Sequence, residues 1–148
     1  MQYGILPPGD ATFRSVALLM ANHERYASMP LQRLKQLRKV IEQGHVWGAT
    51  EGGELRGAVP WREFPRQAVV DAIAARKLPH PKLQAPSGEA LVVLGFIAHS
   101  PADVRPLVDS FREHHKGKII VVKRMFQEGR EARYMWVDRD GRHNGPNL

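Results

Sequence analysis

The stretch that decides the fold is Ala90-Leu91-Val92-Val93-Leu94-Gly95-Phe96-Ile97-Ala98. It is the longest apolar run in the chain, and a continuous run of this length is typical of a strand buried on both faces. Directly after it comes Ser100-Pro101-Ala102-Asp103, which has an N-cap serine, a first-turn proline and an acidic third residue, close to a capping box. A buried strand leading straight into a capped helix predicts an α/β protein with a ligand crevice at the carboxyl end of that strand.

The residues that follow predict one helix and two strands. The helix buries apolar side chains at helical spacing, namely Val104, Leu107, Val108 and Phe111. Strands are expected at 118–125 and 132–137, around Gln127-Glu128-Gly129. We therefore expect a single domain over 1–137 and a flexible polar C-terminal tail over 138–148.

The residues before the apolar run predict three helices and a hairpin. Asp10 is expected to cap the first helix, Ser28 the second with Pro30 in its first turn, and Gly44 to end the second. The turn signal Glu51-Gly52-Gly53-Glu54 joins the two strands of the hairpin. The expected elements are helices at 11–24, 30–43 and 65–77, strands at 45–50 and 55–61, and a proline-containing loop at 78–88. Together they predict a mixed sheet with helices on its faces.

Composition limits the chemistry. The 148 residues contain no cysteine, which excludes disulfides, thiolate metal sites and cysteine nucleophiles. The start lacks a basic and apolar signal segment, and the longest apolar run is shorter than the roughly 20 residues that span a bilayer, so we expect a cytoplasmic protein. The net charge of +7 favours an acidic partner without selecting one.

Several strings, together with the element order, resemble the RTX toxin-activating lysine acyltransferases, the haemolysin-activating family. The likeness spans roughly 13–124, with sparse identities. The strings that carry it are Asn22-His23-Glu24-Arg25 before Met29-Pro30, the strand end Ala58-Val59-Pro60-Trp61, the run Val92–His99, the helix segment Leu107–Arg112 and the strand Lys118–Lys123.

The resemblance implies a GNAT-like fold and transfer of a fatty acyl group from acyl carrier protein to a protein lysine amine. It implies no cofactor beyond the acyl carrier protein, an acidic donor that suits a basic surface, and a possible homodimer. It also implies that His23 is the catalytic residue. Histidine suits this role because its protonation changes near neutral pH.

One position departs from the family. The family's catalytic aspartate aligns with Gly95, so the carboxylate that normally orients the histidine is missing there. Asp103 is a candidate substitute, although its capping position explains it more simply. If the enzyme is active, a main-chain donor between Ala98 and Ser100 is expected to stabilise the oxyanion.

Four side chains are candidates for an acyl pocket: Trp47, Trp61, Phe96 and His99. Large aromatic residues on strands are more often core, and a histidine after a strand is more often a loop residue. His114 and His115 are expected at the end of a helix, where positive charge complements the negative end of the helix dipole, and no metal site is expected there.

Two functions therefore stay open. The first is an N-acyltransferase with His23 as base. The second is a catalytically decayed binding module on the same fold, which engages or inhibits a macromolecular partner. A nucleic-acid binder ranks last, because the sequence shows neither an aromatic platform nor a helix-turn-helix.

Overall fold

The computed structural model confirms an α/β architecture with a mixed sheet and helices on its faces. It describes residues 1–26, 29–86, 89–124, 133–137 and 143–144. These residues form two compact units. The first consists of Met1–Trp61 and Gly95–Glu113, and the second of Arg62–Leu94 and His114–Leu148.

The first unit is built on an antiparallel sheet. Its strands are β1 (Gln2–Ile5), β2 (Val46–Glu51), β3 (Glu54–Phe64) and β5 (Ile97–Ala98), in the order β1-β2-β3-β5. The last three residues of β3 belong to the second unit. The predicted hairpin is confirmed: Gly52 and Gly53 have φ of 59° and 82°, and positive φ at both central residues is what a two-residue type I′ turn requires.

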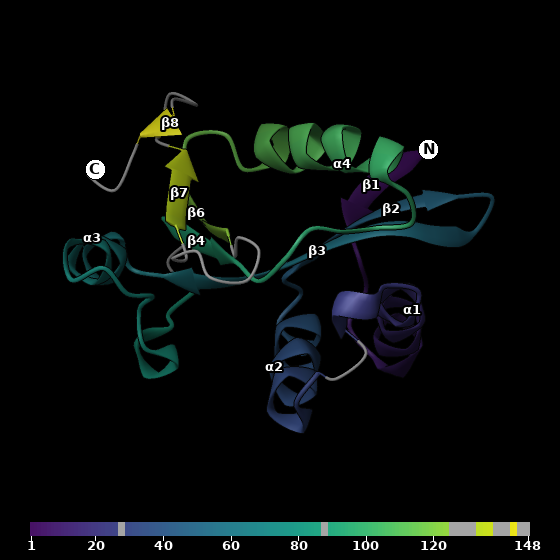
Figure 1. Ribbon diagram of the computed structural model, residues 1–148, viewed down its shortest axis with the longest axis horizontal. Coiled ribbons are helices and arrows are strands. Elements are labelled where there is room, and N and C mark those ends of the chain that lie inside the picture. Colours follow the sequence, from purple (N-terminus) through teal and green to yellow (C-terminus); the bar gives the residue numbers. More distant parts are fainter. Residues whose placement is uncertain (27–28, 87–88, 125–132, 138–142, 145–148) are drawn as a thin grey trace. The chain divides into compact units, whose positions relative to one another are not determined.

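Helices cover both faces of this sheet (Figure 1). On one side lie α1 (Asp10–Ala21) and α2 (Leu31–Glu42), and on the other lies α4 (Pro101–His114). A short 3-10 helix, η1 (Glu24–Tyr26), lies between α1 and α2 in sequence.

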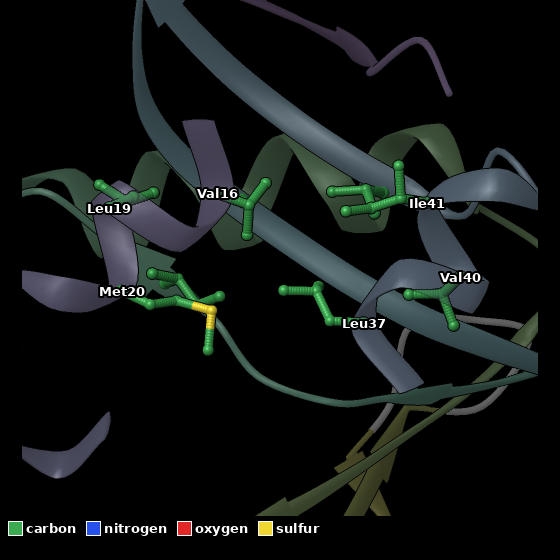
Figure 2. Close-up of a cluster of buried hydrophobic side chains, with 9 residues drawn as sticks. Val16, Leu19, Met20, Leu37, Val40 and Ile41 are labelled. Atoms are coloured by element: carbon green, nitrogen blue, oxygen red, sulfur yellow. The ribbon is translucent and has the colours of Figure 1, made fainter. Parts of the chain in front are cut away.

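The core between the sheet and the α1–α2 pair is a continuous apolar cluster (Figure 2). Its members are Val16, Leu19 and Met20 of α1, Leu37, Val40 and Ile41 of α2, and the strand residues Val46, Ala58 and Ile97. Alternate residues of a strand point to opposite faces, so the neighbours of these strand residues point toward α4. Gly57 is one of them: a Cβ there would lie 3.0 Å from Leu107 Cδ2, so glycine lets α4 pack close to β3.

The second unit has its own mixed sheet and core. It contains α3 (Arg66–Ala74), η2 (Pro81–Leu83), β4 (Ala90–Val93), β6 (Ile119–Arg124), β7 (Arg133–Val137) and β8 (His143–Asn144). β4 pairs in parallel with β6, which pairs antiparallel with β7. The core members are Phe64, Val69, Ile73, Ala90, Val92, Ile119 and Val121.

The apolar run 90–98 is not one strand, contrary to our prediction. Residues 90–93 form β4 in the second unit, and residues 97–98 form β5 in the first. Leu94 and the two residues after it have no strand pairing, and the Leu94 side chain is 38% exposed. Hydrophobicity cannot reveal this break, because both halves of the run are buried.

Several helix details also differ from the prediction. Asp10 is the first residue of α1 rather than its cap, and its carboxylate pairs with Arg38 at 2.7 Å. Pro30 occupies the N-cap position of α2, and Ser28 lies outside the described residues. Val104 is 38% exposed, so α4 buries Leu107 and Phe111 but not this residue.

The ends of the chain add two strands that the pattern did not predict. β1 pairs with β2, and β8 pairs with β7 inside the segment expected to be a tail. Most of that segment lies outside the described residues. Within the part of the chain that the structure describes, no helix is long and apolar enough to cross a membrane.

Candidate active site around His23

His23 lies in the short turn that follows α1. The helix ends at Ala21, and the His23 N–H still donates to the Met20 carbonyl at 3.0 Å. The His23 carbonyl then accepts from the Tyr26 N–H at 3.1 Å, which starts η1. Two backbone bonds therefore fix the peptide that carries the ring.

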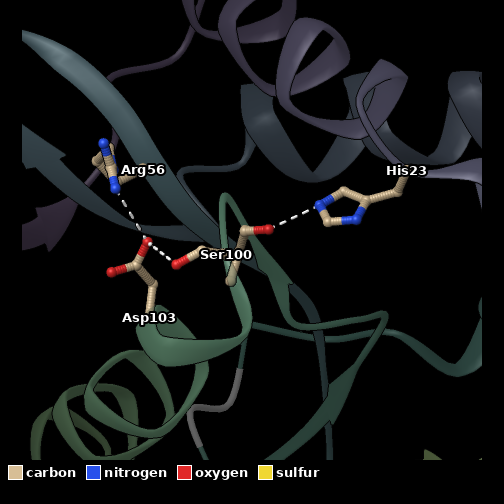
Figure 3. Close-up of polar contacts among 5 residues, drawn as sticks. His23, Arg56, Ser100 and Asp103 are labelled. Atoms are coloured by element: carbon tan, nitrogen blue, oxygen red, sulfur yellow. Dashed lines mark hydrogen bonds and ion pairs between the residues drawn. The ribbon is translucent and has the colours of Figure 1, made fainter.

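The His23 ring points at the end of a strand. Its Nε2 lies 2.6 Å from the carbonyl oxygen of Ala98, the last residue of β5 (Figure 3). A carbonyl oxygen only accepts, so Nε2 must carry the proton. In the neutral ring this leaves Nδ1 with the lone pair, which is the arrangement a general base needs.

Tyr26 stands beside the position of the missing aspartate. A Cβ built on Gly95 would lie 3.5 Å from the Tyr26 hydroxyl oxygen. The Tyr26 ring also meets the His23 ring edge-on, with 6.1 Å between centroids and 84° between planes. The Tyr26 hydroxyl therefore lies beside Gly95, the position at which the resemblance implied a carboxylate, and the group that orients the imidazole here is the Ala98 carbonyl.

The start of α4 holds a small polar cluster (Figure 3). The Ser100 hydroxyl donates to Asp103 Oδ2 at 3.0 Å, and Arg56 Nη2 approaches the same oxygen at 3.4 Å. The hydrogen bond from Ser100, helped by Arg56, lowers the pKa of the Asp103 carboxyl. Asp103 therefore stabilises the start of α4 and pairs with Arg56, which agrees with the structural role that its capping position suggested.

One main-chain N–H in the stretch expected to hold an oxyanion donor already has a hydrogen-bond partner. The His99 N–H donates to the Arg56 carbonyl at 2.8 Å, so the sheet already uses it. The His99 side chain is exposed.

The three aromatic candidates for an acyl pocket lie on the α4 side of the sheet. Trp47 Nε1 donates to the Ser110 hydroxyl at 3.0 Å. Phe111 contacts Trp61 at 5.6 Å and Phe96 at 6.1 Å between ring centroids, both edge-on. The Trp61 ring also stacks on His45 at 5.3 Å. This packing favours a structural role for both tryptophans, and the acyl-pocket assignment stays a prediction.

The structure thus brings together His23, Gly95, Tyr26 and the Ala98 carbonyl. It places Trp47, Trp61 and Phe96 in contact with α4 instead. Sequence reasoning did not predict Tyr26, and it named Ala98 only within the stretch expected to hold an oxyanion donor, not as the acceptor for His23. Tyr26 carried a usable signal, because it lies three residues after His23. A main-chain carbonyl has no sequence signal at all.

No metal centre emerges among residues 1–26, 29–86, 89–124 and the short described segments beyond them, where no three histidine or acidic residues gather. His114 and His115 meet edge-on at 4.7 Å, and Lys118 Nζ lies 3.3 Å from His115 Nδ1. Burial lowers the pKa of His114, with a smaller contribution from Lys118.

No protein-family model matches the chain, and no curated protein matches it in sequence. Solved structures match its fold. The GNAT-like decarboxylase GphF, in complex with isobutyryl-CoA, matches with TM-score 0.60 and 19% identity over 86% of this chain and 68% of its own. The loading GNATL domain of CurA from Lyngbya majuscula matches with TM-score 0.59 and 13% identity over 87% and 68%.

A GNAT-family acetyltransferase from Streptococcus agalactiae 2603 also matches, with TM-score 0.57 and 14% identity over 85% of this chain and 78% of its own. These likenesses confirm the GNAT-like fold that the resemblance implied. At such identities they show the fold alone, and membership of the toxin-activating family stays a prediction.

Proposed function

We propose that this chain is an acyltransferase of the toxin-activating type, which moves a fatty acyl group from acyl carrier protein to a protein lysine amine. The observation that carries the proposal is the contact between His23 Nε2 and the Ala98 carbonyl at 2.6 Å. It orients the imidazole without a carboxylate and leaves Nδ1 to act as base.

In the proposed step, the lysine amine attacks the carbonyl carbon of the acyl thioester. A C–N bond forms and the C–S bond breaks. His23 Nδ1 takes the amine proton and then returns it to the departing thiolate, so the carrier leaves as a free thiol and His23 is regenerated. The Ala98 carbonyl stabilises the transient imidazolium, because its dipole faces Nε2–H throughout.

Two observations bear on the acyl donor. The chain has a net charge of +7, which favours association with an acidic carrier protein. The first turn of α4, where a helix N-terminus would otherwise favour phosphate, already holds the Asp103 carboxylate. A diphosphate such as that of coenzyme A would have to compete with this carboxylate for the helix N-terminus. Because GphF is described with isobutyryl-CoA, acyl-CoA must be tested alongside the carrier.

The test compares acyl transfer by the wild-type chain and by His23→Gln. Acyl-loaded carrier protein or acyl-CoA is mixed with a lysine-containing acceptor peptide, and intact mass reports the acylated product. Loss of a general base lowers the rate by about 10²–10⁴. His80→Gln is the control, since His80 is an exposed histidine of the second unit. Transfer that persists unchanged in His23→Gln removes the base assignment.

A second function is favoured by Gly95 and Tyr26. If the missing carboxylate cannot be replaced, the chain is a binding module on an acyltransferase fold. It then binds acyl carrier protein without turnover, and His23→Gln leaves the dissociation constant unchanged. Absence of transfer from both donors at every acyl length, with carrier binding retained, selects this function.

A further inference from the structure

A single hydrogen bond does not fix the plane of the His23 ring. The bond from Nε2 to the Ala98 carbonyl, 2.6 Å long, anchors one atom of the imidazole (Figure 3). The ring can still turn about that atom, because the terminal torsion of a histidine side chain has broad minima. A base whose lone pair is aimed at an incoming amine needs its plane fixed as well. That restraint has to come from a second contact.

Tyr26 makes a contact of the required kind. Its ring meets the His23 ring edge-on, with 6.1 Å between the ring centroids and 84° between the ring planes. Aromatic rings attract each other at centroid separations of about 4.5–7 Å, and the edge-on arrangement is one that they prefer. Such a contact depends on the angle between two planes, so it restrains the angle that the hydrogen bond leaves open.

Tyr26 is itself held in place by backbone and core. Its N–H donates to the His23 carbonyl at 3.1 Å, and its own carbonyl accepts from the Met29 N–H at 3.2 Å. Its side chain is half-buried and packs against the apolar cluster between the sheet and the α1–α2 pair. The ring that meets His23 is therefore a firm support.

The hydroxyl end of Tyr26 lies beside Gly95. A Cβ at position 95 would lie 3.5 Å from the hydroxyl oxygen, and within the described part of the chain no other atom beyond the neighbouring residues would lie within 4 Å of it. The contact with His23 is made by the ring, whereas the hydroxyl faces the segment before β5. Ring and hydroxyl can therefore be tested separately.

We propose that Tyr26 is the positioning residue for His23. Its ring holds the plane of the imidazole, so that Nδ1 keeps one direction while Nε2 stays on the Ala98 carbonyl. Tyr26 exchanges no proton in this scheme and acts only through His23. The effect on acyl transfer rests on the proposed function, whereas the restraint on the ring is measurable without any substrate.

Two substitutions at position 26 separate the restraint from simple packing. Tyr26→Phe keeps the aromatic ring and removes only the hydroxyl. Tyr26→Leu keeps an apolar side chain against the cluster and removes the ring. If the ring contact positions His23, phenylalanine preserves the restraint and leucine loses it.

The first test measures the His23 ring by nuclear magnetic resonance, on ¹⁵N-labelled protein above neutral pH. The wild-type chain should show one tautomer with the proton on Nε2, slow exchange of that proton with water, and a nuclear Overhauser contact between the His23 and Tyr26 ring protons. Tyr26→Phe should retain the tautomer and the slow exchange. Tyr26→Leu should move both ring-nitrogen resonances toward those of free histidine and speed the exchange by about two- to tenfold, the factor that an aromatic pair contributes.

Tyr3→Leu is the matched control, because Tyr3 is an exposed tyrosine on β1 of the same unit. It should leave the His23 resonances and the exchange rate unchanged. Wild-type His23 resonances in a Tyr26→Leu chain that is folded by circular dichroism overturn the proposal. So does a Tyr26→Phe chain that behaves like Tyr26→Leu. If leucine prevents folding, the absence of the Overhauser contact in the wild type overturns it instead.

The second test measures acyl transfer by the same variants. Tyr26→Leu should lower kcat by about tenfold to a hundredfold. KM should change little, because a misdirected base slows the chemical step rather than binding. Tyr26→Phe should keep the wild-type kcat.

The two tests distinguish failure of the proposal from failure of the proposed function. A wild-type chain that transfers no acyl group but shows the restrained ring contradicts the acyltransferase function and supports the positioning of His23. A wild-type chain that transfers acyl groups no faster than Tyr26→Leu contradicts the positioning role and leaves the acyltransferase function in place.

Discussion

The two faces of the first unit's sheet are covered by different kinds of side chain. On the α4 face, Trp47, Trp61 and Phe96 lie against Ser110 and Phe111 and are largely buried. On the α1–α2 face, the buried cluster consists of aliphatic side chains and methionine. Next to it lies the half-buried His23, which contacts the carbonyl at the end of β5. The difference teaches that large aromatic side chains do not mark the candidate site here, and that His23 lies where the turn after α1 interrupts the packing.

The largest loss of stability should come from creating a cavity on the α4 face of the sheet. Trp61→Ala removes a side chain that is 2% exposed and contacts both His45 and Phe111. The free energy of unfolding should fall by about 3–5 kcal/mol, measured by urea denaturation. A loss below about 1 kcal/mol would show that this face is loosely packed, and it would favour Trp61 as a residue of the acyl pocket.

Adding a larger side chain on the same face should lower the free energy of unfolding by a smaller amount. Gly57→Val places a branched side chain where a Cβ alone would lie 3.0 Å from Leu107 Cδ2. The expected loss is about 1–3 kcal/mol by the same measurement. Adding Leu107→Ala should recover part of it, since the clash is with that side chain. No recovery in the double variant would place the strain elsewhere.

His23 should show the reverse balance, with a small effect on stability and a large effect on acyl transfer. His23→Ala removes one hydrogen bond, to the Ala98 carbonyl, and should lower the free energy of unfolding by only about 1 kcal/mol. Its effect on acyl transfer should be far greater. A stability loss as large as that of Trp61→Ala would mean that His23 is a core residue.

The smallest effect concerns Asp103. Its pKa is lowered in the folded state by the Ser100 hydrogen bond, so its contribution to stability is present above the unfolded pKa near 3.9 and is lost as pH falls through the folded pKa. Wild type should exceed Asp103→Asn by up to about 1 kcal/mol at pH 6, and the gap should narrow as the pH falls below the unfolded pKa. Denaturation over a series of pH values measures the gap, and a constant gap would exclude the ionised carboxylate as the cause.

Sequence patterns predicted those parts of the fold that depend on local chemistry. The Gly52-Gly53 turn was readable because few residues adopt positive φ, and α4 was readable from Ser100 and Pro101. The break between β4 and β5 was not, since its cause is the pairing of each half with a different strand. β1 is short, and pairing with β2 rather than its own pattern makes it a strand.

The candidate site shows the same limit. His23 was selected by resemblance, but its acceptor and Tyr26 were not. Their roles arise because residues far apart in sequence meet in space: His23 with Ala98, 75 positions apart, and Tyr26 with Gly95, 69 positions apart. The aromatic candidates were chosen by size and ring chemistry, which are equally suited to core packing.

The bond from His23 to a main-chain oxygen has a consequence for how this protein can be dissected. The main-chain carbonyl at position 98 stays in place whatever the side chain, so a side-chain substitution there reports on the packing of a buried position and does not remove the imidazole's partner. Only chemistry that edits the peptide group itself, such as replacing the amide that follows Ala98 with an ester, weakens that oxygen as an acceptor.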